Sequence, residues 1–139
     1  MEYPEIIGVE AIPIEIEGEK AFAISEGQTR THKSVVVRII TDEPNIDGVA
    51  EIVCAPPGKP EEIQQEICGV LKTLAENALV GISAENTQSA QRVINERIKG
   101  KVWTKGGLNV ALTDLRAKAL DVSCLSMLGV RGKDAKVPV

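Results

Sequence analysis

The chain has 139 residues and a formal net charge of −4, which is enough length for one domain with its own hydrophobic core. The negative charge and the absence of basic runs interleaved with aromatic residues argue against nucleic-acid binding. No apolar run approaches the roughly 18–20 residues needed to cross a bilayer, and the N-terminus is acidic rather than signal-like. We therefore expect a cytoplasmic protein with no nucleic-acid or membrane partner; its aromatic residues are Tyr3, Phe22 and Trp103.

Three cysteines, Cys54, Cys68 and Cys124, are widely spaced and odd in number. They form neither a C-x-x-C motif nor a disulfide framework, so we interpret them as buried or half-buried thiols in a reducing compartment. The single histidine, His32, cannot complete a zinc site with them without further ligands. The sequence therefore predicts no metal site within this chain.

The first predicted strand, Glu10–Glu17, alternates Ile12, Ile14 and Ile16 with polar residues and Pro13. This period of two is typical of a half-buried strand, and we expect the three isoleucines to form its buried face. Pro13 predicts an edge position, because proline cannot donate to the ladder. The polar stretch Gly18–Lys33 that follows is interpreted as a long loop with a function, or alternatively as a disordered excursion.

Two further strands are predicted, Ser34–Thr41 and Val49–Cys54. Between them, Asp42–Asn45 and the Asp47-Gly48 pair supply turn chemistry. The prolines that follow Ala55 end the third strand, since neither can extend a ladder.

Three helices complete the predicted order. Pro60-Glu61-Glu62 should open the first one, because proline is tolerated in a first turn and carboxylates there face the positive end of the helix dipole. The second should be capped near Asn86 or Thr87. The apolar stripes of the three helices are Ile63, Ile67, Val70, Leu71 and Leu74; Ala90, Val93, Ile94 and Ile98; and Leu108, Ala111, Leu112, Leu115, Ala119 and Val122.

A three-stranded antiparallel meander followed by a helical bundle is an α+β fold. A search for catalytic groups within it finds no nucleophile–base–orienter set. Glu51 and Asp114 are single carboxylates, for which a structural role is the simpler interpretation, and Asp114 can pair with Lys118 one turn away. The glycines of Gly100–Gly107 lack a Walker pattern and a preceding strand, so we interpret them as helix-entry glycines rather than a phosphate loop.

The end of the chain resembles a known family. The residues ALTDLRAKAL (111–120) and SMLGVRGKDAKVPV (126–139) are similar to the segment of enolase-superfamily enzymes that joins the last long helix of the N-terminal capping domain to the first barrel strand. Ile98–Gly107 resembles more specifically the muconate cycloisomerase subgroup of the mandelate racemase/muconate lactonizing enzyme family. The resemblance extends over nearly the whole chain.

This resemblance implies an enolase N-terminal-domain-like fold, with residues 1–130 as the capping domain and 131–139 as the start of a (β/α)-barrel that the chain does not contain. In the family the barrel carries the catalytic bases and the carboxylates that bind Mg²⁺ or Mn²⁺, so no catalytic residue and no metal ligand is expected here. The complete enzyme would remove a proton next to the carboxylate of a small substrate, as a cycloisomerase, epimerase or racemase. Its implied partners are the barrel domain or fragment and, when complete, other copies of itself.

The family's capping domain contributes two loops that close over the substrate, and here they correspond to about Ala21–Lys33 and Val53–Gly58. The implied selectivity residues are Phe22, Ile24, Ser25, Cys54, Ala55 and Pro56. Phe22 could instead pack into the domain's own core. Two functional alternatives stay open: a dipeptide epimerase of the same superfamily, and a stand-alone, non-catalytic α+β binding domain.

Overall fold

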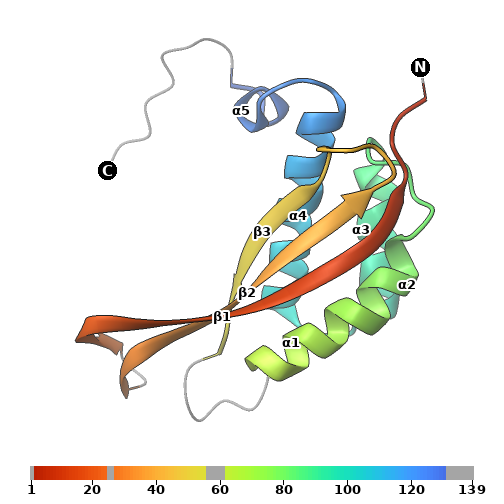
Figure 1. Ribbon diagram of the computed structural model, residues 1–139. Coiled ribbons are helices and arrows are strands. Elements are labelled where there is room, and N and C mark those ends of the chain that lie inside the picture. The colour runs from red at the N-terminus through yellow and green to blue at the C-terminus, as the bar shows by residue number, and fades with distance from the viewer. Residues whose placement is uncertain (1, 25–26, 56–61, 131–139) are drawn as a thin grey trace.

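The computed structural model describes residues 2–24, 27–55 and 62–130, and of residues 19–24 and 27–30 it describes the backbone alone. The first three elements form one antiparallel sheet in the order β1-β2-β3, and the helices that follow cover one face of it (Figure 1). This confirms the α+β fold predicted from the sequence. The elements are β1 (Ile6–Ile24), β2 (Gly27–Thr41), β3 (Gly48–Val53), α1 (Gln64–Val70), the π-helical turn η1 (Leu71–Ala75), α2 (Glu76–Leu79), α3 (Thr87–Arg97), α4 (Val102–Ala119) and α5 (Cys124–Met127).

The expectation of a long loop or a disordered excursion over Gly18–Lys33 is wrong. β1 continues to Ile24 and β2 begins at Gly27, and the two strands pair antiparallel through this region with one register shift between Glu17 and Phe22. A ladder satisfies backbone N–H and C=O groups whatever the side chains are, so a polar stretch without hydrophobic alternation can extend a hairpin. We call residues 15–24 and 27–33 the hairpin arm; it projects beyond the helices in Figure 1.

The buried face of β1 also differs from the prediction. Val9 and Ala11 belong to the core, whereas Ile12 and Ile16 are 40% and 56% exposed. The register explains this, because Val9 and Ala11 stand opposite Ile39 and Val37, which are fully buried on β2. A period of two identifies two faces but not which one the helices cover.

The edge position expected from Pro13 is confirmed, since β1 pairs only with β2 along most of its length. The backbone N–H of Val9 donates instead to Oε2 of Glu76 at the start of α2, at 3.3 Å. Backbone N–H groups alternate in direction along a strand, so the backbone nitrogen of Pro13 faces away from β2, as the N–H of Val9 does. The missing N–H of Pro13 therefore costs no ladder bond.

The helical segment 64–79 departs from its prediction at both ends of the expected stripe. α1 begins at Gln64 rather than at Pro60, and Ile63 is its N-cap residue. Ile67 and Leu71 are buried as expected and Val70 is half-buried, but Ile63 and Leu74 are exposed. A π-helical turn contains more residues than an α-helical turn, so buried residues here recur every four positions rather than every three. The buried stripe therefore continues from Leu71 through Ala75 and Leu79, and Leu74 stays outside it.

The other two helices largely follow their predictions. Asn86 caps α3, where its Oδ1 accepts the N–H of Ser89 at 3.2 Å. α4 begins at Val102, so Gly106 and Gly107 lie inside the helix rather than at its entry. Four residues of the α4 stripe are buried, namely Leu108, Ala111, Leu112 and Leu115; Ala119 is partly buried, and Val122, beyond the helix end, is exposed.

Candidate functional site

The hairpin arm and the segment after β3 correspond to the two loops predicted to cover a substrate, and they leave the same end of the sheet. β3 pairs with β2 as far as Val53, opposite Ser34, and beyond that point β1 and β2 continue alone as the hairpin arm. The N–H of Cys54 makes a last bond to the carbonyl of Lys33, at 3.1 Å. We call this region, together with residues 62–66 and the first turn of α4, the loop end of the domain (Figure 1).

Glu62 joins three elements at the loop end. Its carbonyl accepts the N–H of Ala55 at 3.1 Å, just beyond β3. Its carboxylate accepts the backbone N–H groups of Trp103 at 3.2 Å and Thr104 at 2.8 Å, in the first turn of α4. These are N–H groups without an intrahelical partner, and Lys101, the N-cap residue, makes no side-chain cap bond. Glu62 therefore caps a helix 41 residues further along the chain.

Glu66 supports Glu62 from the next turn. Its Oε2 accepts the N–H of Glu62 at 3.2 Å and the ammonium of Lys101 at 2.7 Å. These two contacts, the lysine first, lower the pKa of the Glu66 carboxyl. The result is a chain of charge-assisted contacts from α1 to the start of α4.

Gln64 holds the point at which the hairpin arm leaves the three-stranded sheet. Its side-chain amide donates to the carbonyls of Ile14 and Ser34, both at 3.0 Å. These carbonyls belong to paired residues of β1 and β2. One side chain at the start of α1 therefore bridges both strands of the hairpin.

Two cross-strand charge pairs with exposed side chains lie near the loop end, in opposite phases of the strand alternation. Lys33 pairs with Glu15 at 3.1 Å, and Nε2 of His32 lies 3.4 Å from Oε1 of Glu51. The neighbouring Ser34 hydroxyl and the His32 imidazole lower the pKa of Glu51. Ser34 is fully buried, and its Oγ makes no hydrogen bond of ordinary geometry to another described residue. Glu51 thus has the structural pairing role expected from the sequence.

The structure places the predicted selectivity residues as follows. The backbones of Phe22 and Ile24 pair with Thr29 and Gly27 in the hairpin arm, while their side chains, and all of Ser25 and Pro56, lie outside the described residues. Cys54 and Ala55 are half-buried at the exit of β3. Burial and the nearby Cys68 thiol raise the pKa of Cys54, against a smaller effect of Lys33, so Cys54 is a poor nucleophile.

Sequence reasoning missed Glu62 and Gln64 as functional candidates. It assigned Glu62 to the first turn of its own helix, on the strength of the Pro60-Glu61-Glu62 pattern. No local signal could have directed the carboxylate to Thr104, because that contact joins residues 42 positions apart whose meeting depends on the tertiary fold.

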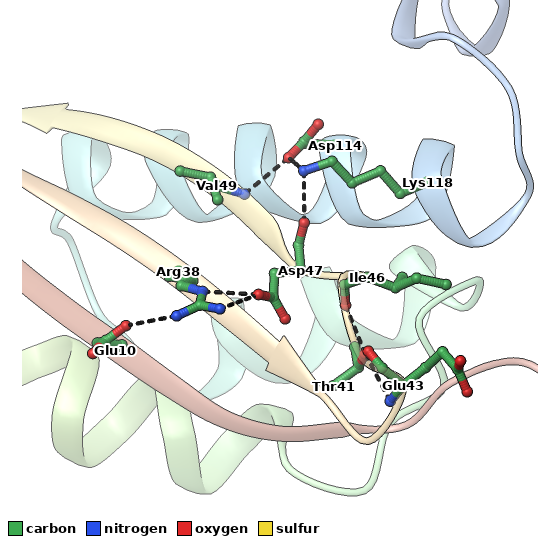
Figure 2. A network of polar contacts seen from close by, with 9 residues as sticks. All are labelled: Glu10, Arg38, Thr41, Glu43, Ile46, Asp47, Val49, Asp114 and Lys118. Carbon is green, nitrogen blue, oxygen red and sulfur yellow. Dashed lines mark hydrogen bonds and ion pairs between the residues drawn. The ribbon is translucent and has the colours of Figure 1, made fainter.

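The opposite end of the sheet carries a second polar network, shown in Figure 2. Asp114 and Lys118 pair at 2.7 Å as predicted, and Asp114 also accepts the N–H of Val49 at 3.0 Å. Lys118 donates to the carbonyl of Asp47 at 2.8 Å, and the Asp47 carboxylate accepts from Nε of Arg38 at 2.8 Å. The network fastens α4 to the β2–β3 turn, which is a structural role.

Across residues 2–24, 27–55 and 62–130, no group of three or more His, Cys, Asp or Glu side chains could hold a metal ion. Among the helices of the same residues, none is long and apolar enough to span a membrane.

Residues 7–129 match the family described as mandelate racemase / muconate lactonizing enzyme, N-terminal domain. No curated protein matches the chain.

Solved structures share the fold. A muconate lactonizing enzyme from Pseudomonas fluorescens, complexed with muconolactone, has a TM-score of 0.85 at 21% identity, over 96% of this chain and 36% of that one. The L-Ala-D/L-Glu epimerase from Bacillus subtilis has a TM-score of 0.80 at 23% identity, over 89% and 34%. The N-succinyl Arg/Lys racemase from Bacillus cereus has a TM-score of 0.74 at 26% identity, over 84% and 31%. The chain thus spans about a third of the length of these proteins. With residues 7–129 matched, it belongs to the mandelate racemase/muconate lactonizing enzyme N-terminal domain family of the enolase superfamily.

Proposed function

We propose that this chain is the capping and substrate-selecting domain of a larger enzyme that removes a proton next to a carboxylate, with muconate cycloisomerisation as the leading reaction. The observation that carries the proposal is the match of residues 7–129 to an N-terminal domain whose solved relatives are about three times as long. At 21% identity, the muconate lactonizing enzyme from Pseudomonas fluorescens shares the fold of this chain, and the reaction is our proposal.

Epimerisation or racemisation is the second candidate. The relatives include an L-Ala-D/L-Glu epimerase at 23% identity and an N-succinyl Arg/Lys racemase at 26%, both within the 21–28% range of the muconate lactonizing enzymes. All three substrate classes contain a carboxylate, so the proposed capping domain would serve the same chemistry in each case.

The divalent ion implied by the family finds no fitting set of ligands among residues 2–24, 27–55 and 62–130. The described residues offer no cluster of ligands for it. In the proposal, Mg²⁺ or Mn²⁺ belongs to the barrel, where it would stabilise negative charge on the substrate carboxylate. We assign no role in binding it to any residue of this chain.

The role proposed for this chain is to cover and select the substrate. The hairpin arm and the exit of β3 leave the same end of the sheet, which is the arrangement that lets two segments converge on one ligand. Covering segments exclude water and strengthen electrostatic interactions beneath them. Phe22, Ile24, Ser25, Cys54, Ala55 and Pro56 remain the proposed selectivity residues.

The test compares this 139-residue chain with the complete polypeptide that contains it in its source. Both are incubated in D₂O with magnesium or manganese and a panel of muconates, dipeptides and N-succinyl amino acids. NMR follows the conversion of the muconates to lactones and the loss of the α-proton signal in the other two classes. The complete polypeptide should exchange or convert one class, and the isolated chain none. Turnover by the isolated chain would contradict the assignment of chemistry to the barrel. If the source polypeptide has no barrel and no turnover is seen, the stand-alone binding domain is favoured.

A further inference from the structure

Glu62 has an unusual backbone for its residue type. Its φ is 60°, in the left-handed region that residues with a β-carbon seldom occupy. Such conformations persist where surrounding contacts hold them, and they cluster at functional positions. Contacts of Glu62 with its surroundings should therefore hold its backbone in the left-handed conformation.

Glu62 forms hydrogen bonds with three separate segments, which hold this backbone conformation. The carbonyl of Glu62 faces Ala55 after β3, its N–H faces the Glu66 carboxylate on α1, and its own carboxylate faces the first turn of α4. The turned backbone directs the carbonyl and the side chain to two different elements at once. α1 itself begins only at Gln64, so starting its own helix does not account for these bonds.

We propose that Glu62 is a positioning residue, which holds Ala55, the neighbour of Cys54 at the exit of β3, in a fixed relation to the start of α4 and thereby tunes substrate selectivity. The selectivity part rests on the proposed function, because Cys54 and Ala55 are candidate selectivity residues of the complete enzyme. The positioning part rests only on the contacts of Glu62. The two parts can therefore be tested separately.

The first test measures amide hydrogen exchange in the 139-residue chain, for Glu62→Ala, Glu62→Gln and the matched control Glu96→Ala. Glu96 is an exposed glutamate in the last turn of α3, outside the contacts described for Glu62 and Glu66. Losing the carboxylate in Glu62→Ala should speed exchange at Trp103 and Thr104 about tenfold or more, and also at Ala55, while Val37 in the core stays protected. Glu62→Gln should fall between, since an amide oxygen accepts hydrogen bonds more weakly than a carboxylate. Glu96→Ala should match the parent.

Trp103 is the single tryptophan of the chain, so its fluorescence reports on the same site.

If the amide of Ala55 keeps full protection from exchange in Glu62→Ala while that of Thr104 loses it, Glu62 only caps α4 and the proposal fails. If Val37 loses protection to the same extent, the role is general stability and the proposal also fails. Should Glu62→Ala not fold, the same comparison in Glu62→Gln decides.

The second test uses the complete enzyme and two substrates that differ in size. Glu62→Ala should change the ratio of their kcat/KM values by threefold or more, and Glu62→Gln should restore most of the parental ratio. An equal fall for both substrates would overturn the selectivity part. A parent enzyme that turns over neither substrate would contradict the proposed function, and the exchange measurement would still decide whether Glu62 positions Ala55.

Discussion

The backbone of Gly107 in α4 lies directly against the side chain of Ile52 in β3, with no space for a β-carbon between them. Ile52 is 2% exposed, so the contact closes the core between helix and sheet. Gly48 makes a similar close approach to Ala111 and Leu115. The absence of a side chain at these positions allows α4 to pack closely under β3.

This contact distinguishes two neighbouring glycines of one helix. Gly107→Ala should destabilise the domain by about 1–3 kcal/mol, because the added methyl group overpacks the core. Gly106 has open space around its α-carbon, so Gly106→Ala should be neutral or stabilising by up to about 1 kcal/mol, through helix propensity. Urea unfolding of both variants measures the difference. Equal effects would show that α4 is not seated on β3 as described.

A second prediction concerns the buried stripe of α4. Leu115 is fully buried, and Leu115→Ala should lower the free energy of unfolding by roughly 2–5 kcal/mol, through lost burial and the cavity left behind. Val110 on the same helix is 59% exposed, and Val110→Ala should change it by no more than about 0.5 kcal/mol. Thermal and urea unfolding check the pair. A Leu115→Ala variant that melts with the parent would show that the helix face is wrongly assigned.

Acid should weaken the contacts around Glu66. The pKa of its carboxyl is lowered by Lys101 and by the N–H of Glu62, so the folded state favours the charged form. That contribution is present above the ordinary carboxyl pKa and is lost as the pH falls through the lower, folded value. Glu66→Gln should therefore be less stable than the parent at pH 7, and the difference should shrink toward about pH 3. Unfolding midpoints across this range test it, with the exposed Glu96→Gln as control; a difference that grows with acid would contradict the sign.

The three thiols should differ in reactivity. Cys124 is exposed, while Cys54 and Cys68 are half-buried and burial raises the pKa of Cys54. A thiol reagent at about pH 7.5 should modify Cys124 fastest, because thiolate fraction and access set the rate. Cys124→Ser should abolish the fast phase. If the fast phase survives, one of the other two thiols is more accessible than the structure shows.

Selectivity of the complete enzyme should depend on the hairpin arm. If Phe22 and Ile24 contact the substrate, Phe22→Ala and Ile24→Ala should change the discrimination between substrates by about 1–3 kcal/mol in kcat/KM, with the melting temperature nearly unchanged. Kinetics on paired substrates and thermal unfolding measure the two effects. A large fall in melting temperature with an unchanged substrate profile would assign Phe22 to the core.

Local chemistry in the sequence determined much of the fold. Asn86 caps α3 because its side chain can bond the N–H three residues on, and Pro13 indicates an edge strand because it has no N–H to donate. The spacing of Leu108, Leu112 and Leu115 identified the buried side of α4 because that helix is regular. Each of these signals acts within a few residues of the chain.

Tertiary packing decided the features that build the candidate site. Only pairing between β1 and β2 could show that a polar stretch is a hairpin arm, and only the helix layer could select Val9 and Ala11 over Ile12 as the buried face. Glu62 reaches Thr104 across 42 residues, a contact that depends on the tertiary fold. Such contacts depend on the relative placement of whole elements, which periodicity and propensity within one element do not encode.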